Sequence, residues 1–496
     1  MCERSVIRRQ GILLSFLGLV LLAGLPTACG IIPSGPADIA STSASTGQPM
    51  GGVPETSPPL DGSGLSLATA PPDAPPVVTH GPIVGGVSDS TAVVFVRSSS
   101  AASVSILYST DPSFEVDLHT SSIAQATAEG DFTAQVGIRD LKASTTYFYE
   151  VLLSGNVQEL AIEHRFTTAP PPEAIVDFGF AVFSDLSSDP PFDAPAYLSA
   201  AAEAPAFVLQ IGDFDHREPG GSRFPSITIS NWRTMHQEVL QDNLSGQDLA
   251  RYITPRFPLY HIWDDHDYGG NNTDRTRWWK GLATQAFKEY YPLPPLPNPD
   301  GGLWYSFRYA QAQFFILDLR SQRDQSGDPQ IPEPSMLDGG HIANDQKTWL
   351  KEALAASTAH WKFVISTSVW NPTSKQGDSW NGYRQEQEEL VDYVHEKGIT
   401  GVIIISGDLH SAGGIDNGTN SYFPELSVPA TNMRGSRHCT GGSCGLWSEG
   451  MITGIDPSGY AMVHVLHDVA TGLDKVVLET KAADGGLRLE HTVTLP

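Results

Sequence analysis

The pattern of apolar and polar residues changes three times along the chain and predicts four segments of different structure. Residues 11–25 are almost continuously apolar, residues 30–76 are mostly Ser, Thr, Pro, Gly and Ala, and residues 77–169 alternate between apolar and polar. From residue 175 onward, short apolar runs recur without alternation. Alternation predicts half-buried strands, whereas unbroken runs of this length are typical of strands that are covered on both faces.

Residues 1–29 have the features of an export signal. Arg4, Arg8 and Arg9 precede an apolar run that is too short for a membrane span but suits a signal peptide. The run ends in Leu-Pro-Thr-Ala-Cys, which resembles a bacterial lipoprotein box with Cys29 as the lipidated residue. Cleavage without lipidation is the alternative, and Arg8-Arg9 leaves both Sec and twin-arginine export open. We expect an exported cell-envelope protein, either lipid-anchored to a membrane or periplasmic or extracellular.

The next two segments predict a tether and a small β domain. Residues 30–76 contain no aromatic residue, Lys or Arg, so they bury too little surface to offset the entropy of ordering and should be a disordered tether. Strand-like runs with turn signals between them follow at residues 92–97, 104–108 and 132–138. Residues 141–149 resemble the tyrosine-corner entry of a fibronectin type III or immunoglobulin-like sandwich, which we predict over residues 77–169.

Residues 175–496 predict an α/β domain. Its unbroken apolar runs lie at residues 178–183, 207–211, 314–317, 363–365 and 402–405. Two helical patterns separate them: Asn344 is a candidate N-cap for a helix through Ala356, and a second helix runs from Arg384 to Lys397. We expect the solvated face of the second helix to carry its glutamates, Glu386, Glu388, Glu389 and Glu396.

The charge balance narrows the possible partners. The 496 residues include 30 basic and 56 acidic ones, a formal net charge of −26. Nucleic-acid binding and attachment to anionic membranes both need a basic patch, so we expect no nucleic-acid partner and membrane contact only through the lipid anchor. Beyond the leader the cysteines are Cys439 and Cys444, which predict a disulfide because a metal site would need further Cys ligands.

Acidic residues follow the predicted strands of the α/β domain. Asp185, Asp213, Asp318 and Asp408 each come after an apolar run, and residues 259–263 lead into Asp-Asp-His-Asp. The carboxyl ends of strands form the ligand crevice of an α/β sheet. A single such Asp is more often a turn or helix cap, but several converging carboxylates repel one another unless cations hold them. The repetition therefore predicts a metal centre.

These acidic motifs occur in the order used by calcineurin-like metallophosphoesterases. The motifs at residues 264–267 and 407–412, the segment 314–323, and Gln346 followed by Trp349-Leu350 resemble the PhoD-like alkaline phosphatase family. The resemblance covers nearly everything beyond the tether. It implies a phosphoric ester hydrolase with an α/β (α+β) metallophosphoesterase fold, in which a β-sandwich core is flanked by helices and preceded by the fibronectin type III or immunoglobulin-like domain.

The resemblance also implies a role for each ligand. Asp185 would bind one metal ion, Asp213 would bridge two and Asp265 would bind the second, while Asp408 and His410 would complete the cluster. His266 would lie beside the oxygen of the leaving group.

Two departures from the family pattern concern the metals. Asp185 stands close to a position where the family often has Cys, and His216 stands where it has Tyr, both associated with a ferric ion. The resemblance implies two or more metal ions, with Ca²⁺ and Fe³⁺ as the family's pair. Asp185 and His216 as ligands also suit Mn²⁺, Zn²⁺ or Fe²⁺.

The predicted reaction is hydrolysis of a phosphate ester by a metal-bound hydroxide. Metal ions lower the pKa of bound water toward about 7 and neutralise the charge of the phosphate. His266, oriented by Asp267 or Asp264, would donate a proton to the departing oxygen. A structural or metal-bound histidine is the alternative.

Four further residues are candidates for contact with the substrate. Arg320 and Arg323 follow a strand end, and a guanidinium matches a phosphate bidentately. The alternative for both is a salt bridge with Asp318 or Asp324. Asn271 and Asn272 follow two glycines and would bind substrate or simply form a turn.

These observations predict an exported, metal-dependent phosphohydrolase, alkaline phosphatase D-like, acting as a monomer on small phosphate monoesters and also diesters. One alternative is a phosphodiesterase, phospholipase D-like, acting on lipid or cell-envelope phosphodiesters. A non-enzymatic alternative is a surface binding protein with an inert metal site. Bulk negative charge does not exclude an anionic substrate, because bound metals and nearby arginines would make the crevice locally positive.

Overall fold

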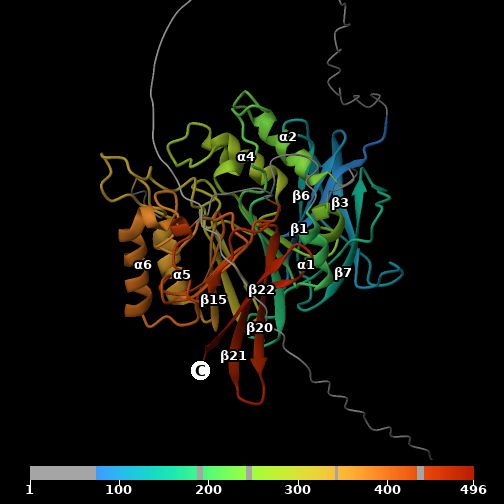
Figure 1. Ribbon diagram of the computed structural model, residues 1–496. Coiled ribbons are helices and arrows are strands. Elements are labelled where there is room, and N and C mark those ends of the chain that lie inside the picture. The colour runs from blue at the N-terminus through green and yellow to red at the C-terminus, as the bar shows by residue number, and fades with distance from the viewer. Residues whose placement is uncertain (1–73, 187–193, 242–247, 341–344, 433–440, 496) are drawn as a thin grey trace, which may run out of the picture. The chain divides into compact units, whose positions relative to one another are not determined.

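A computed structural model describes residues 74–186, 194–241, 248–340, 345–432 and 441–495 (Figure 1). The predicted signal peptide with Cys29, nearly all of the predicted tether, Asn344 and Cys439 lie outside the described residues. Within the described ranges, every helix is too short or too polar to cross a lipid bilayer.

Residues 78–167 form two antiparallel sheets around one apolar cluster, which includes Val94, Ile106 and Phe166. The first sheet has the order β1 (Val78–Gly85), β2 (Ala92–Ser98), β6 (Thr133–Ile138). The second has the order β4 (His119–Thr120), β3 (Ala102–Ser109), β7 (Thr146–Leu153), β8 (Asn156–Val157), with β5 (Ala124–Ala126) on β3 and β9 (Arg165–Thr167) on β7. The Tyr147 hydroxyl accepts a hydrogen bond from Lys142 N at 2.9 Å, as a tyrosine corner requires. Assignment of these sheets to the fibronectin type III or immunoglobulin-like class stays a prediction.

Two mixed sheets form the rest of the described chain. One has the order β12 (Leu259–Ile262), β11 (Val208–Ile211), β10 (Phe178–Phe183), β20 (Gly459–Asp468), β21 (Leu473–Ala482), β22 (Leu487–Leu495). The other has the order β13 (Tyr305–Tyr309), β14 (Ala312–Ile316), β15 (Trp361–Ser366), β16 (Val402–Ser406), β18 (Pro424–Ser427), β17 (Gly414–Asn417), β19 (Gly450–Met451). In the first sheet β10, β11 and β12 are parallel, and in the second β14, β15, β16 and β18 are parallel.

The two mixed sheets face each other across a core of aromatic rings. Phe180 of β10 lies edge-on to Phe314 of β14 and Phe363 of β15, with ring centroids 5.1 and 5.3 Å apart. Along a strand, alternate residues point to the other face of the sheet and meet the helices. Phe183, for example, packs on Tyr197 of α1 with ring centroids 4.5 Å apart. The helices are α1 (Pro195–Ala202), α2 (Ile229–Leu240), α3 (Asp265–Tyr268), α4 (Lys280–Tyr290), α5 (Gln346–Ala356) and α6 (Arg384–Glu396). Short helical turns lie at Leu249–Ile253, Trp380–Tyr383 and Gly441–Cys444.

Helices α5 and α6 pack on the outer face of the second mixed sheet (Figure 1). Asp345 caps α5, because its side chain accepts a hydrogen bond from Thr348 N. The solvated role predicted for Glu386 is wrong. Its carboxylate is buried and accepts hydrogen bonds from the backbone of Met336 and Leu337, since the loop before α5 crosses the first turn of α6.

Candidate metal centre

The predicted metal ligands lie at the carboxyl ends of parallel strands from both mixed sheets. Because those ends meet at one edge of the core, residues that are distant in sequence converge there. The ligands and the strands that they follow are Asp185 after β10, Asp213 and His216 after β11, Asp265 after β12, and Asp408 and His410 after β16.

Four of these side chains form a compact, buried group. The ligand atoms of Asp185, Asp213, His216 and His410 all lie within 4.8 Å of one another. His410 Nε2 is 3.0 Å from Asp185 Oδ1, and His216 Nε2 is 3.3 Å from Asp213 Oδ2. We call Asp185, Asp213, His216 and His410 the four-ligand cluster.

The donor atoms of the four-ligand cluster fit a metal ion. Both carboxylate oxygens of Asp185, Oδ2 of Asp213 and Nε2 of His216 are buried, and apart from their contacts with each other they have no hydrogen-bond partner among the described residues. Burying polar atoms in this way is costly unless a ligand satisfies them. His216 Nδ1 donates to Leu186 O at 2.6 Å, which orients the ring and leaves the Nε2 lone pair for a cation.

Neighbouring charges shift the pKa values of two members of the four-ligand cluster. Burial lowers the pKa of His216, but the Asp213 carboxylate outweighs burial and raises that pKa to about 9. Burial raises the pKa of Asp185, but the neighbouring His410 more than compensates and holds it below its ordinary value. A metal ion that binds His216 therefore displaces its proton.

At four of the predicted ligands, the backbone adopts a left-handed conformation that residues other than glycine rarely take. Asp185, Asp213, Asp408 and His410 have φ angles of 57°, 46°, 60° and 51°. Such strain is concentrated at functional sites, where the surrounding fold imposes it. Gly212 is required beside them, because a Cβ there would lie 2.5 Å from Asp264 Cβ.

A second group places His266 beside the four-ligand cluster. Ligand atoms of Asp213, Asp265 and His266 lie within 4.8 Å of one another. Asp265 accepts backbone hydrogen bonds from His266 at 2.8 Å and from Asn272 at 2.7 Å. Asn271 and Asn272 are both exposed, and the Asn272 amide, in the orientation that satisfies it, donates to Asp378 at 2.7 Å. A substrate contact by either asparagine stays a prediction.

The carboxylate that orients His266 differs from both predicted ones. Glu218 Oε2 is 3.2 Å from His266 Nδ1. Asp267 instead accepts hydrogen bonds from the backbone of Phe214 and Asp264, because it caps the turn that begins α3. No local sequence pattern points to Glu218, since it lies in the loop after β11 and meets His266 only in the folded chain.

Asp264, Arg320 and Asp408 form a buried ion-pair network rather than a phosphate site. Arg320 Nε and Nη2 donate to Asp264 at 2.6 and 2.7 Å, and Nη2 also donates to Asp408 at 3.2 Å. Thr367 donates to Asp264 as well, at 2.6 Å. The Asp264 oxygens are thus already satisfied, which sets Asp264 apart from Asp185 as a metal ligand.

The phosphate contact of Arg320 and Arg323 stays a prediction, and both arginines are engaged by carboxylates. Arg320 is fully buried, and Arg323 donates to Asp378 Oδ1 at 2.7 Å and to Thr273 O at 3.0 Å. The alternative was a salt bridge, and both arginines form one, with Asp378 in common. The predicted partners are wrong, because Asp318 accepts from Trp263 and Leu303, and Asp324 pairs with Arg275.

Two further residues of the site, besides Glu218, escaped the sequence prediction. Asp378 accepts hydrogen bonds from both Arg320 and Arg323, and the Lys375 ammonium is 3.3 Å from Asp378 Oδ2. Lys375 also forms an ion pair with the Asp408 carboxylate. Burial lowers the pKa of Lys375, but Asp408 and Asp378 raise it by more. An Asp and a Lys in a polar loop are too common for the sequence to single them out.

Cys444 is disulfide-bonded, and its predicted partner Cys439 lies outside the described residues.

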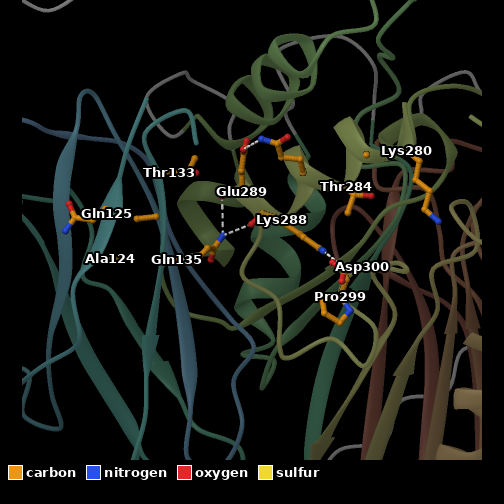
Figure 2. Close-up of a pocket in the computed structure, with 13 residues that line it drawn as sticks. Ala124, Gln125, Thr133, Gln135, Lys280, Thr284, Lys288, Glu289, Pro299 and Asp300 are labelled. Atoms are coloured by element: carbon orange, nitrogen blue, oxygen red, sulfur yellow. Dashed lines mark hydrogen bonds between the residues drawn. The ribbon is translucent and has the colours of Figure 1, made fainter. Parts of the chain in front are cut away.

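An open groove of about 870 Å³ lies elsewhere, between β5–β6 and α4 (Figure 2). Gln135 bridges its walls by donating to Lys288 O and Glu289 O. Its lysines are engaged, since Lys280 Nζ donates to Ser321 O and Lys288 Nζ to Pro299 O. The groove contains none of the four-ligand cluster, so we place the chemistry at the strand ends.

Solved structures share this fold. One, described as the structure of PhoD, superposes with a TM-score of 0.61 at 19% identity and covers 82% of this chain and 87% of its own. The purple acid phosphatase PPD1 from yellow lupin (Lupinus luteus) seeds has a TM-score of 0.51 at 14% identity, covering 85% and 74%. The chain therefore shares the fold of these two proteins.

Sequence comparison identifies the family. The model of the PhoD-like phosphatase matches residues 193–438, and that of the PhoD-like phosphatase N-terminal domain matches residues 64–170. The chain belongs to the PhoD-like phosphatase family, which confirms the predicted resemblance. Alkaline phosphatase D of Bacillus subtilis (strain 168) is 26% identical over 313 residues, 55% of this chain and 52% of that protein. The match thus spans about half the length of this relative.

Proposed function

We propose that this protein is a metal-dependent phosphohydrolase that cleaves phosphate monoesters and also diesters. The observation that carries the proposal is the convergence of buried oxygen and nitrogen atoms of Asp185, Asp213 and His216 at the strand ends. Within the described part of the chain, these atoms have no hydrogen-bond partners outside the cluster. Family membership supports it, as does the Bacillus subtilis relative, which is an alkaline phosphatase by name.

The residues present would hold metal ions at two adjacent positions. The four-ligand cluster would bind one ion, and Asp213 and Asp265 would bind a second beside it. Two carboxylates with two imidazoles suit Mn²⁺, Fe²⁺ or Zn²⁺ at the first position, whereas Fe³⁺ and Ca²⁺ are the family's expectation. Bound metal ions would polarise the phosphoryl oxygen and lower the pKa of water.

The chain's own contribution is proton transfer and orientation. Glu218 holds His266 by Nδ1, so that Nε2 stays available to donate a proton to the departing oxygen. Asp265 fixes the backbone of His266 through its 2.8 Å hydrogen bond. Asp265 is buried, which strengthens its hydrogen bond to the His266 backbone.

Turnover and metal content of the full-length protein test the proposal. We would measure bound metals by mass spectrometry and compare p-nitrophenyl phosphate with bis(p-nitrophenyl) phosphate. Asp213→Asn should lose metal and at least about 10³-fold in turnover, because Asp213 belongs to both groups. Asp474→Asn is the matched control, since Asp474 is a buried Asp that pairs with His360 and His467. Full metal occupancy without turnover of either ester would favour the inert binding protein.

Export and lipid anchoring are a further part of the proposal, supported by the apolar run at residues 11–25 and the cysteine that follows it. Cys29→Ala should move the protein from the membrane fraction to the soluble fraction in a bacterial host. The monomeric state, also a proposal, is tested by light scattering on the purified protein.

A further inference from the structure

A phosphate substrate needs a cation that it can reach, and three cations surround the acidic pair Asp378 and Asp408. These are Arg320, Arg323 and Lys375. The side chains of Arg320 and Arg323 are 0% and 3% exposed, whereas that of Lys375 is 25% exposed. Of the three side chains, that of Lys375 is therefore the most exposed to solvent.

Lys375 is close to the metal centre. Its Nζ donates to Asp408 O at 3.0 Å and forms an ion pair with the Asp408 carboxylate. That carboxylate belongs to a group with Asp213 and Asp264 whose ligand atoms lie within 4.8 Å of one another, and it is 3.8 Å from His410 Nε2. One carboxylate therefore separates the ammonium from the four-ligand cluster.

The loop holds Lys375 in place. Its backbone N–H donates to Ser443 O at 3.1 Å, and its carbonyl accepts from the Ser379 hydroxyl. Its φ angle of 38° is unusual for a residue with a side chain, so the surrounding contacts impose it. A polar pocket of about 280 Å³ lies beside this loop. Gln376, Gly377 and Asp378, which follow Lys375 directly, form one wall, and Asn272 and Arg323 line it as well.

We infer that Lys375 contacts a non-bridging oxygen of the substrate's phosphoryl group and positions it against the metal centre. This inference rests on the proposed function, because it assigns Lys375 a role in the proposed hydrolysis of phosphate esters. An ammonium carries three donors, and a phosphate dianion at the mouth of the site takes one of them. Arg320 continues to neutralise Asp408 when Lys375 turns toward the phosphate, because it donates to Asp408 at 3.2 Å.

Binding of inorganic phosphate to the metal-loaded full-length protein tests this role without depending on turnover. Lys375→Met removes the charge and keeps the aliphatic stem, and Lys375→Arg restores the charge. Lys351→Met is the matched control, since Lys351 is 26% exposed and pairs with Glu389 at 2.9 Å. We expect Lys375→Met to raise the Kd for phosphate at least tenfold, Lys375→Arg to stay within about threefold of the wild type, and Lys351→Met to leave Kd unchanged.

Two results would overturn the inference. One is wild-type phosphate affinity in Lys375→Met. The other is a loss of bound metal in that variant in parallel with the loss of phosphate, which would assign Lys375 to the metal cage. In assays with p-nitrophenyl phosphate, the variant should raise KM more than it lowers kcat. Lysine-dependent phosphate binding in a protein without turnover would refute the proposed function and leave the inference standing.

Discussion

Glu218 Oε2 lies 3.2 Å from Nδ1 of His266, and the two residues come from different strand ends. Burial lowers the pKa of His266, but Asp213 and Glu218 together raise it to about 10 in the metal-free chain. Glu218 also accepts a hydrogen bond from Asn271 N at 3.0 Å, so its carboxylate is itself held in place. The pair resembles the carboxylate–imidazole arrangements that fix a catalytic histidine.

Replacing Glu218 should therefore impair the proposed reaction. Glu218→Gln keeps the size of the side chain but weakens its hold on His266, and we expect kcat to fall roughly 10–100-fold with little change in KM. Steady-state kinetics on p-nitrophenyl phosphate measure this. Glu449→Gln is the control, because Glu449 lies 3.5 Å from His491 Nδ1 away from the site. A wild-type kcat in Glu218→Gln would show that His266 needs no carboxylate partner.

Metal removal should lower thermal stability through the four-ligand cluster. The wild-type Tm should rise on addition of metal ion and fall again with a chelator, since a ligand at about 100 times its Kd stabilises by about 2.7 kcal/mol. Asp185→Asn should abolish most of this shift, because both Asp185 oxygens lie in the cluster and have no hydrogen-bond partner among the residues that the structure describes. Calorimetry with and without metal measures it. An equal metal-induced shift in the variant would remove Asp185 from the ligand set.

Arg320 should act on stability rather than on substrate affinity. Arg320→Met leaves Asp264, Asp378 and Asp408 buried without their shared cation, and breaking such a network costs about 3–5 kcal/mol. Urea unfolding of the metal-free protein measures the loss, and Arg320→Lys should recover part of it. A variant of wild-type stability with a raised KM would instead restore the substrate contact predicted from the sequence.

Glu425 should make the protein less stable as pH rises. It is fully buried on β18, and burial raises its pKa from 4.5 to about 8 although Ser406 and Trp370 N donate to it. Between those two pH values the unfolded chain has released this proton while the folded chain still holds it. Stability therefore falls as pH rises from about 4.5 to about 8, and then levels off.

Glu425→Gln should flatten this part of the pH profile, with a gain over the wild type of about 1–3 kcal/mol at pH 8 relative to pH 5. Urea unfolding at several pH values measures it. Glu396→Gln, at an exposed position on α6, should leave the profile unchanged. A profile of Glu425→Gln that runs parallel to the wild type would mean that Glu425 is ionised in the folded protein at neutral pH.

Local hydrophobic patterns predicted the strands of the α/β domain, residues 175–496, well. The apolar runs 178–183 and 402–405 became β10 and β16 almost residue for residue, because a run buried on both faces has few other stable arrangements. Helix α6 also begins at the predicted Arg384. Which face of that helix is exposed was harder to predict. Glu386 is buried by a loop, and the helical pattern gives no sign of that loop.

The ligands were predictable and their supporting residues were not. Asp185, Asp213 and Asp408 each follow a strand, so the order of motifs along the chain suffices to find them. Glu218, Lys375 and Asp378 lie in loops, where no position relative to a strand end identifies them. They reach the site only because β11, β15 and β16 end beside one another in the folded chain.

The amino-acid sequence by itself determined the strand-ending carboxylates, the family to which they belong and the class of metal-dependent chemistry, because these depend on residue types at local spacings. The tertiary structure alone decided which charges are paired. It buried Arg320 among three aspartates and left Lys375 at the surface of the site, a distinction that depends on desolvation and on neighbours far away in the chain. The two positively charged side chains therefore differ in their surroundings: Arg320 is buried in an ion-pair network, whereas Lys375 is partly exposed.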